Sequence, residues 1–421
     1  MNIYLTFLFY AIPSFSILIL IEMIVARVMG VTINRSTDMI SSLSSGLTNT
    51  IKDAIKFGIV LVSYSSMVDS MTIYKLEPIW FAAIIAFIIE DFAGYWIHRL
   101  NHRVNIFWNR HVIHHSSEEF NLSCALRQSI STTFKFSAIL FIPAALLGIP
   151  AYIFAILGPI HLFMQFWYHT QLIGKMGILE HIIVTPSHHR VHHAINSKYL
   201  DKNYGQIFIV WDKLFGTFQE ELGKVKPVYG ILRPTKTWNP ILINYKHLYQ
   251  LIKDAWHAER IIDKVRIWFM PTGWRPEDVS KKYPLEHIED PTKQIKYDTN
   301  TSIPLSIWSW TQYVLTVIMM LHMFTVVGDV EPRMGYMYAF FLFVHIFSLT
   351  ALLDGKWYSL ISESGKIGLA GILIYNQQYS WYGIDGLPIN LFSAYLIISL
   401  ILTYSFLKMN QKKNKMENYG I

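Results

Sequence analysis

The sequence has little charge and almost no cysteine. Of its 421 residues, 15% are charged and 52% are hydrophobic, whereas soluble domains carry about 25% charged residues. This composition argues against an ordinary water-soluble enzyme and against a disordered chain. The one cysteine, Cys124, excludes a disulfide within the chain and a metal site built from several cysteines. The sequence also lacks a P-loop, H-E-x-x-H, G-x-S-x-G and G-x-G-x-x-G.

The net charge of +7 is not gathered in a nucleic-acid-binding motif. The chain has 36 lysines and arginines against 29 aspartates and glutamates, and no known reader motif accompanies them. We therefore exclude nucleic acid as a partner. In a membrane protein the same excess arises from cationic loops that face the cytosolic leaflet.

Long apolar runs dominate the sequence. A helix needs about 20 apolar residues to cross a bilayer, and runs near that length recur throughout. Gly148 and Pro150 interrupt the stretch 134–169, which predicts a helical hairpin there and leaves open whether it crosses fully. We expect an all-α, polytopic membrane protein with about nine transmembrane or re-entrant helices, at about residues 3–25, 52–73, 79–97, 134–148, 150–169, 305–328, 336–353, 359–381 and 389–408.

Basic residues follow the first and last runs, at Arg27 and Arg35 and in the tail 412–415. Because basic loops stay in the cytosol, we expect the N-terminus outside and the C-terminus inside. Segment 170–304, with 19 basic and 14 acidic residues, then lies on the cytosolic side. The membrane would be the endoplasmic reticulum in a eukaryote and the inner membrane in a bacterium.

The runs divide the chain into four expected segments. Residues 1–78 carry N-terminal membrane helices, and 79–220 form the catalytic region. Residues 221–304 form a cytosolic or interfacial segment, and 305–421 carry C-terminal membrane helices and a basic tail.

Histidine is concentrated in the catalytic region. Of the 17 histidines, 12 fall between His98 and His193. A lone histidine in a membrane protein is more often a hydrogen-bonded interfacial residue than a ligand, but three clusters, each just beyond an apolar run, favour a metal. The clusters are His98-Arg-Leu-Asn-His102, His111-Val-Ile-His114-His115 and His189-Arg-Val-His192-His193.

The spacing within each cluster suits metal binding. Residues three and four apart share a helix face, so each cluster can turn two or three imidazoles toward one point. Imidazole suits Fe, Zn, Cu or Ni. Eight such ligands exceed what one ion accepts, and we therefore predict two metal ions on the cytosolic face.

Three residues outside the clusters also bear on the site. His169 closes the hairpin on the same face and is a candidate ninth ligand, whereas we expect His161 to be structural. Asp91 lies in an apolar run, where a carboxylate is costly. It is seven residues before His98 and could orient that ligand from outside the metal's own shell. The alternative is that Asp91 pairs with a neighbouring helix.

The clusters lie within longer motifs. Together these give residues 90–220 a specific resemblance to the fatty acid hydroxylase superfamily, which includes the sterol desaturases, and above all to its alkylglycerol monooxygenase branch. The further apolar runs at 305–408 are also expected of that branch. The motifs are Tyr95-Trp-Ile-His-Arg99, His114-His-Ser-Ser-Glu-Glu-Phe-Asn-Leu-Ser123, Ala125-Leu-Arg-Gln-Ser129, Gln165-Phe-Trp-Tyr-His-Thr170, Thr185-Pro-Ser-His-His-Arg-Val-His-His193, Asp201-Lys-Asn-Tyr204 and Trp211-Asp-Lys-Leu-Phe-Gly-Thr-Phe218.

The resemblance implies an iron enzyme. Two iron ions held by the histidines would use O2 to hydroxylate a carbon of a lipid in the bilayer, and on an ether lipid that carbon adjoins the ether oxygen. Asn121 and Asn203 fall within the matching motifs, and we expect them, with Asp91, to support the ligands from outside. Electrons must come from an external donor, which in the alkylglycerol branch is tetrahydrobiopterin.

The chain departs from that branch at two positions. A glutamate is expected beside the pterin after the second histidine of the first cluster, where this chain has Arg103, and another glutamate is common at Gln171. An arginine cannot accept hydrogen bonds from the donor-rich edge of a pterin. We therefore expect poor use of the pterin, with Arg103 contacting an acidic redox partner, a phosphate-bearing head group or anionic lipid instead.

Three other functions are alternatives to the hydroxylation of an ether lipid. The same metal site could hydroxylate or desaturate a fatty acid or a sterol with electrons from a protein donor. A metal transporter would place its ligands near the middle of the bilayer, whereas these clusters lie at the ends of the apolar runs. A structural or sterol-sensing protein leaves the eight histidines unexplained.

Overall fold

Helices make up nearly all the regular structure of the chain. The computed structural model describes residues 3–56, 59–60, 62–132, 134–135 and 137–419. The longer helices are α1 (Ile3–Val28), α2 (Ser36–Ala54), α4 (Ile79–Arg103), α8 (Ala151–Phe166), α11 (Pro240–His257), α14 (Ile303–Val326), α15 (Pro332–Leu353), α16 (Tyr358–Asn376) and α17 (Gly386–Tyr419). The shorter ones are α3 (Tyr64–Met71), α5 (Asn105–Trp108), α6 (Val112–His115), α7 (Ile142–Leu146), α9 (Pro186–His192), α10 (Val210–Leu214), α12 (Ile261–Arg266) and α13 (Glu277–Lys282). Strands β1 (Ile59–Val60) and β2 (Phe134–Lys135) form a short parallel pair.

Among the residues that the structure describes, five helices are long and apolar enough to cross a membrane, which supports the predicted integral membrane protein. The five candidate spans are Phe7–Val28, Ile79–Arg103, Ile303–Val326, Pro332–Leu353 and Gly386–Gln411. Each covers one of the runs seen in the sequence. The prediction of a helical membrane protein is thus confirmed. The predicted count of nine spans is not confirmed, since five helices meet the criteria of length and hydropathy.

The prediction of a span at 52–73 is wrong. The chain leaves α2 at Ala54, and α3 occupies only Tyr64–Met71. Eight helical residues extend about 12 Å, far short of a bilayer. The polar residues at the start of the run explain the difference, since Lys52 and Asp53 form an ion pair there at 3.4 Å.

Helix α2 runs through the interior instead, and the hydropathy pattern gave no sign of it. Its serines at 41, 42, 44 and 45 are fully buried. Small side chains let neighbouring helices approach closely, and α2 packs against α11, α14 and α15. Burial of a polar helix places its hydroxyl and carboxylate groups where they can bond to the histidine-bearing loops.

The stretch 134–169 forms the predicted interrupted hairpin. Its two apolar arms, Ser137–Leu146 and Ala151–Phe166, are both shorter than a full span. The turn depends on Gly148, whose φ is +60°, a conformation that costs other residues energy. A Cβ at this position would also lie 2.8 Å from Cγ2 of Thr72.

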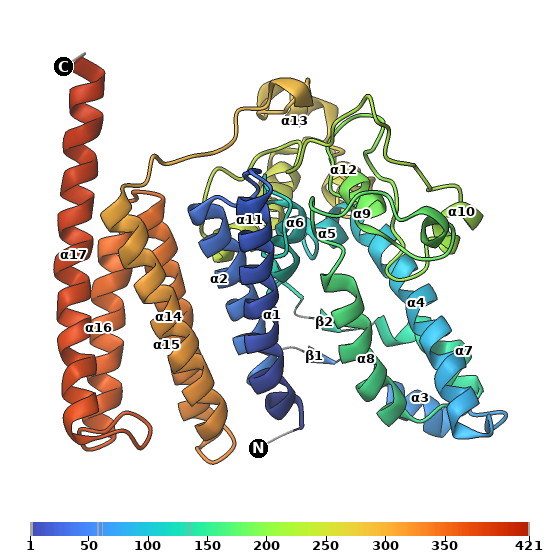
Figure 1. Cartoon of the computed structure of the whole chain (residues 1–421), viewed down its shortest axis with the longest axis horizontal. Helices are drawn as coiled ribbons and strands as arrows, with labels where there is room; N and C mark the ends of the chain where they lie inside the picture. The colour runs from blue at the N-terminus through green and yellow to red at the C-terminus, as the bar shows by residue number, and fades with distance from the viewer. Residues whose placement is uncertain (1–2, 57–58, 61, 133, 136, 420–421) are drawn as a thin grey trace.

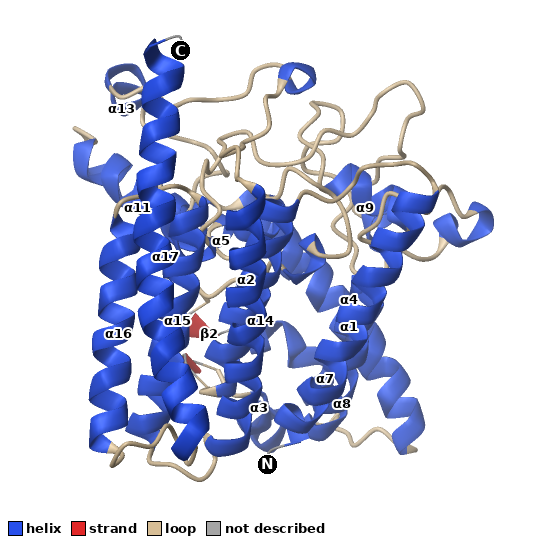
Figure 2. Ribbon diagram, turned by 60° about the vertical axis from the view of Figure 1, so that its left-hand side comes forward, coloured by secondary structure: helices blue, strands red, loops and turns tan. Residues whose placement is uncertain are grey.

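The C-terminal helices α14 to α17 pack against one another in sequence order (Figure 2). Their core includes Met320, Phe341 and Leu373. Helix α16 also holds a buried ion pair, in which Lys366 Nζ lies 2.5 Å from Glu363 Oε1. These two charges lower the mean hydropathy of α16, which is therefore not among the five candidate spans, although it packs against α15 and α17.

The two ends of the molecule differ in structure. The N-terminus and the loops after α14 and α16 lie at one end, while the C-terminal end of α17 and most of segment 170–304 lie at the other (Figure 1). The second end carries irregular chain and short helices above the long ones. Helix α4 brings the first histidine cluster to this end.

Candidate metal centre

Three chain segments bring the histidine clusters together. The first cluster occupies the last turns of α4, where His98 and His102 are one turn apart. The second surrounds the one-turn helix α6, and the third lies on and just after α9. Thr185 caps α9 and Pro186 begins it, both typical of a helix N-terminus.

The nine predicted ligand histidines assemble into two groups. Within each group, every residue offers a ring nitrogen, and these atoms all lie within 4.8 Å of one another. Group A contains five histidines and group B contains four, including His169. Group A is His98, His102, His111, His115 and His192, and group B is His114, His169, His189 and His193.

In several of these rings Nδ1 contacts the protein and Nε2 faces the group. In group A, Nδ1 of His98 lies 2.8 Å from the Tyr204 carbonyl oxygen, and Nδ1 of His192 lies 2.9 Å from that of Lys202. In group B, Nδ1 of His169 lies 2.9 Å from the Gln165 carbonyl oxygen. A carbonyl can only accept, so each of these Nδ1 atoms donates, and each neutral ring keeps a lone pair on Nε2.

The Nε2 lone pairs of His169 and His114 therefore face each other at 3.3 Å, because Nδ1 of His114 also lies against a carbonyl oxygen, that of Arg127. In group A the Nε2 atoms of His98 and His111 are 2.9 Å apart. His192 Nε2 is buried and has no hydrogen-bond partner among the described residues. Two neutral acceptors at this distance repel unless a cation lies between them. Metal–imidazole bonds of about 2.0–2.1 Å place adjacent ligand nitrogens about 3 Å apart, so both groups fit a metal ion.

Burial keeps the histidines that do not belong to α4 in the neutral form, which is the form that binds metal. It holds the pKa of His111, His114 and His192 well below the usual value, and neighbouring histidines add to the effect. Burial also lowers the pKa of His169, to about 3. A metal competes with protons for imidazole nitrogen, so a buried neutral ring is a ready ligand.

The clusters and the groups do not coincide, contrary to the expectation that each cluster serves one point. His114 lies in group B while its neighbour His115 lies in group A, and His193 and His192 divide in the same way. Consecutive helical residues point about 100° apart, so neighbours in one turn face different groups. The i, i+4 relation holds in all three clusters, for His98 with His102, His111 with His115 and His189 with His193.

Asp91 is placed differently from its expected role beside His98. Its carboxylate accepts from the backbone N–H groups of Ile207 and Phe208 at 2.8 and 3.1 Å. It also pairs with His161 of α8 at 3.1 Å. Pairing with a neighbouring helix was the alternative, and this is what the structure shows. Asp91 thereby anchors the loop that follows the Tyr204 carbonyl.

The two asparagines also act on backbone. Asn203 donates to the His188 carbonyl at 3.0 Å and so holds α9 beside its ligands. Asn121 donates to the Ile33 carbonyl at 2.7 Å and ties the loop after α6 to the α1–α2 connection. Both contacts suit support of the groups from outside.

Arg103 forms an ion pair with Asp201. The distance from its Nη1 to Asp201 Oδ2 is 3.0 Å, and the other carboxylate oxygen lies 3.7 Å from Nδ1 of His102. The carboxylate near group A is thus shared between a ligand and an arginine. Gln171, the second departure from the family pattern, donates to the Phe120 carbonyl at 2.8 Å.

A buried clamp from α2 was missed in the sequence. Asp38 accepts from Arg127 at 3.0 Å and from Ser117 at 2.7 Å. The carbonyl oxygen of Arg127 lies 3.2 Å from Nδ1 of His114. Only the Ala125–Ser129 motif could have pointed to Arg127, and nothing in the polar sequence of α2 pointed to Asp38.

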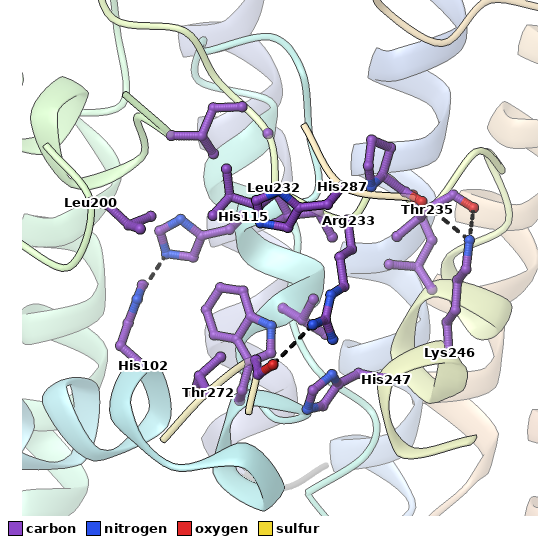
Figure 3. A pocket seen from close by; sticks show the side chains of 18 of the residues that line it. His102, His115, Leu200, Leu232, Arg233, Thr235, Lys246, His247, Thr272 and His287 are labelled. Carbon is purple, nitrogen blue, oxygen red and sulfur yellow. Dashed lines mark hydrogen bonds between the residues drawn. The ribbon is translucent and has the colours of Figure 1, made fainter. Parts of the chain in front are cut away.

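A pocket of about 500 Å³ adjoins group A (Figure 3). Its near wall includes His102, His115 and His192, and its far wall is built from segment 221–304, including Arg233 and Lys246. An organic molecule in this pocket would lie against the edge of the metal centre. The pocket is of a size typical of small-molecule sites.

Comparison with known proteins decides the family. A family model described as fatty acid hydroxylase matches residues 83–217, which contain all nine histidines. The chain is 33% identical to human alkylglycerol monooxygenase over 393 residues, which covers 92% of this chain and 86% of the human protein. The chain belongs to the fatty acid hydroxylase family.

Other members of the family match to different extents. The alkylglycerol monooxygenase of Danio rerio is 40% identical over 274 residues, covering 63% of this chain and 59% of that protein. The ornithine lipid hydroxylase of Rhizobium tropici is 33% identical over 142 residues, covering 34% of this chain and 43% of its own length. These names support a lipid monooxygenase. No solved structure matches the chain.

Proposed function

We propose that this protein is a membrane-bound di-iron monooxygenase that uses O2 to hydroxylate a C–H bond of an ether lipid of the alkylglycerol type. The observation that carries the proposal is the pair of histidine groups whose buried Nε2 lone pairs converge. Similarity to alkylglycerol monooxygenases along most of the chain supports the choice of substrate.

The residues of the two groups suit two ions of the same kind. Group A would hold one through His98, His102, His111, His115 and His192, and group B the other through His114, His169, His189 and His193. When bound, ferrous ions would supply the redox chemistry that activates O2. Imidazole also suits zinc, but zinc has no redox chemistry to offer an oxygenase.

The protein's own part is to position the groups and exclude water. Carbonyl groups fix the orientation of the rings, and the ligands are largely buried. Such outer contacts hold ligands in place and set their basicity. The adjoining pocket lets a lipid present one carbon to group A while the remainder of the molecule stays in the pocket or the bilayer.

The overall reaction accounts for all atoms. Substrate, O2, two electrons and two protons give a hydroxylated lipid and water. When the hydroxyl is placed on the carbon beside the ether oxygen, the product is a hemiacetal. Its hydroxyl proton moves to the ether oxygen as the C–O bond breaks, which releases a fatty aldehyde and the glycerol hydroxyl.

The electron donor is external, either tetrahydrobiopterin or a redox protein. The ion pair between Arg103 and Asp201 favours a donor other than the pterin, because neither the arginine nor the engaged carboxylate is free to pair with a pterin edge. We place the metal centre on the cytosolic side, supported by the basic tail at the same end of the molecule.

Relatives that act on other lipids match a smaller part of the chain. The ornithine lipid hydroxylase and a sterol desaturase of Gibberella zeae cover 34% and 37% of it. The human alkylglycerol monooxygenase alignment covers 92%, so it extends beyond the histidine region. This difference favours the ether-lipid reaction over fatty acid or sterol oxidation.

The test is turnover by purified protein in lipid nanodiscs. Iron-loaded protein receives O2, a reductant and an alkylglycerol, and fatty aldehyde is measured by mass spectrometry. Incorporation of one 18O atom from 18O2 into the trapped aldehyde is expected. Fatty acid or sterol products from a mixed lipid extract, without aldehyde, would overturn the choice of substrate.

A further inference from the structure

The pocket beside group A carries positive charge that its own carboxylates do not neutralise. At its far wall, Arg233 donates from Nη2 to the Gly273 carbonyl at 2.9 Å (Figure 3). Among the described residues, no carboxylate forms an ion pair with Arg233. The nearby carboxylate of Asp254 is held by Arg275 at 2.6 and 2.8 Å.

Lys246 is in a similar position. Its ammonium donates to the carbonyl groups of Pro234 and Thr235, and within the described part of the chain it has no carboxylate partner. Partial burial lowers the pKa of Arg233, where Arg275 adds to the effect and Asp254 opposes it. The pKa of the more exposed Lys246 is also lowered by loss of solvent, with Lys236 adding to the effect and Glu286 opposing it. An anion bound beside either side chain would relieve that cost.

The acidic residues that line the pocket are engaged elsewhere. Glu286 binds Lys236 through both carboxylate oxygens at 2.6 and 2.7 Å. Asp201 binds Arg103 at 3.0 Å. The two histidine groups contain no carboxylate at all, so bound metal would add positive charge to the near wall.

We propose that Arg233, assisted by Lys246, is a specificity-determining site for the phosphate of an amphipathic substrate whose carbon chain reaches group A. Arginine presents several N–H donors in a fixed plane that matches the oxygens of phosphate. Apolar lining residues such as Val112 and Leu232 suit the lipid part of the same molecule.

This inference deepens the proposed function and rests on it for the reacting carbon. It assigns the substrate to phosphate-bearing ether lipids rather than to neutral alkylglycerols. It also moves the expected phosphate contact from Arg103, which is paired with Asp201, to Arg233. In an ether lipid the glycerol backbone separates the phosphate from the reacting carbon, so the inference requires one molecule to extend from group A to Arg233.

The test measures binding and turnover separately. Two lipids are compared, 1-O-hexadecylglycerol and its 3-phosphate, with iron-loaded full-length protein in detergent under argon, where no oxidation occurs. We expect wild type to bind the phosphate ester more tightly. Arg233→Gln should weaken binding of the ester about tenfold or more, because a charge-assisted hydrogen bond is lost, and leave the neutral lipid within about twofold.

Two further variants separate charge from folding. Arg233→Lys keeps the charge and should retain part of the preference. Lys281→Gln removes an exposed cation that pairs with Glu277 outside the pocket and should change neither affinity. All variants are checked by thermal unfolding, and if Arg233→Gln does not fold, Arg233→Lys and Lys246→Gln carry the comparison.

Several outcomes would overturn the inference. These are equal affinity of wild type for the two lipids, an equal loss for both in Arg233→Gln, or inorganic phosphate binding as tightly as the phosphate ester. The last would assign the site to free phosphate. If the ester binds under argon with the expected dependence on Arg233 but yields no aldehyde in air, the proposed function fails and the anion site stands.

Discussion

Asp38 and Arg127 form a buried ion pair of 3.0 Å, and the carbonyl of the same arginine lies 3.2 Å from Nδ1 of His114. The side chain of Arg127 thus anchors the loop to α2, and its backbone orients a ligand ring. Both charges are at most 2% exposed. Helix α2 therefore takes part in the metal centre although it carries no histidine.

Replacing Asp38 should damage group B in particular. Asp38→Asn leaves the Arg127 guanidinium buried without a counter-charge, which costs about 3–5 kcal/mol. We expect a lower melting temperature and loss of metal from group B ahead of group A, seen as a fall in iron per chain. The matched control is Asp69→Asn, at an exposed site in α3. Full iron content in Asp38→Asn would show that the clamp does not position His114.

The metal content itself is directly measurable. Purified protein should hold about two iron atoms per chain, since nine imidazoles exceed the ligand number of one ion. His114→Ala and His192→Ala each remove a ligand, one from each group, and should lower bound iron and abolish turnover. His181→Ala is the control, because this exposed histidine belongs to neither group. Full activity of either ligand variant would contradict the two-metal assignment.

Arg103 allows a test of the electron donor. With tetrahydrobiopterin as sole reductant and an alkylglycerol as substrate, wild type should release aldehyde slowly. Arg103→Glu breaks the pair with Asp201 and supplies an acceptor, and release should rise up to about tenfold, the value of one charged hydrogen bond. Arg103→Gln controls for loss of the positive charge alone. Rapid turnover by wild type would show that a carboxylate at this position is dispensable.

The orientation in the membrane can be tested with tags. Tags near Asn300 and after Lys415 should both report the cytosolic side, since these regions lie at the same end of the molecule (Figure 1). A third tag at Gly328, in the loop after α14, should report the opposite side. Opposite readings for Asn300 and Lys415 would refute the arrangement of the C-terminal helices.

The histidine centre could be predicted because its signal is local. Spacings of three and four residues on short helices forecast which rings could meet, and His169 joined them from the end of the hairpin. The division of His114 and His115 between groups was not foreseen. The i, i+4 pairs share a group in all three clusters, whereas the i, i+3 pairs His111–His114 and His189–His192 are divided between the groups.

The fold was predictable where helices are apolar and obscure where they are polar. The bounds predicted from the runs at 305–328 and 336–353 agree with those of α14 and α15 to within four residues. Helix α2 escaped detection because its buried face is built from serines, and a hydropathy scale treats serine as a surface residue. Ser42 and Ser45 make tertiary hydrogen bonds, to Arg127 and Gln128. The role of Asp91 could not be inferred from its spacing to His98, because its partners are His161 on α8 and a loop more than 100 residues later in the chain.

The division of neighbouring histidines between the groups has a mechanical consequence. His114 and His115 serve different groups, as do His192 and His193, and successive Cα atoms are held about 3.8 Å apart by a rigid peptide unit. The two groups are therefore linked at two places by a single peptide unit of fixed length. A displacement of α6 or α9 would carry histidines of both groups together, so ions bound in the two groups would be expected to respond to oxidation or substrate as a coupled pair.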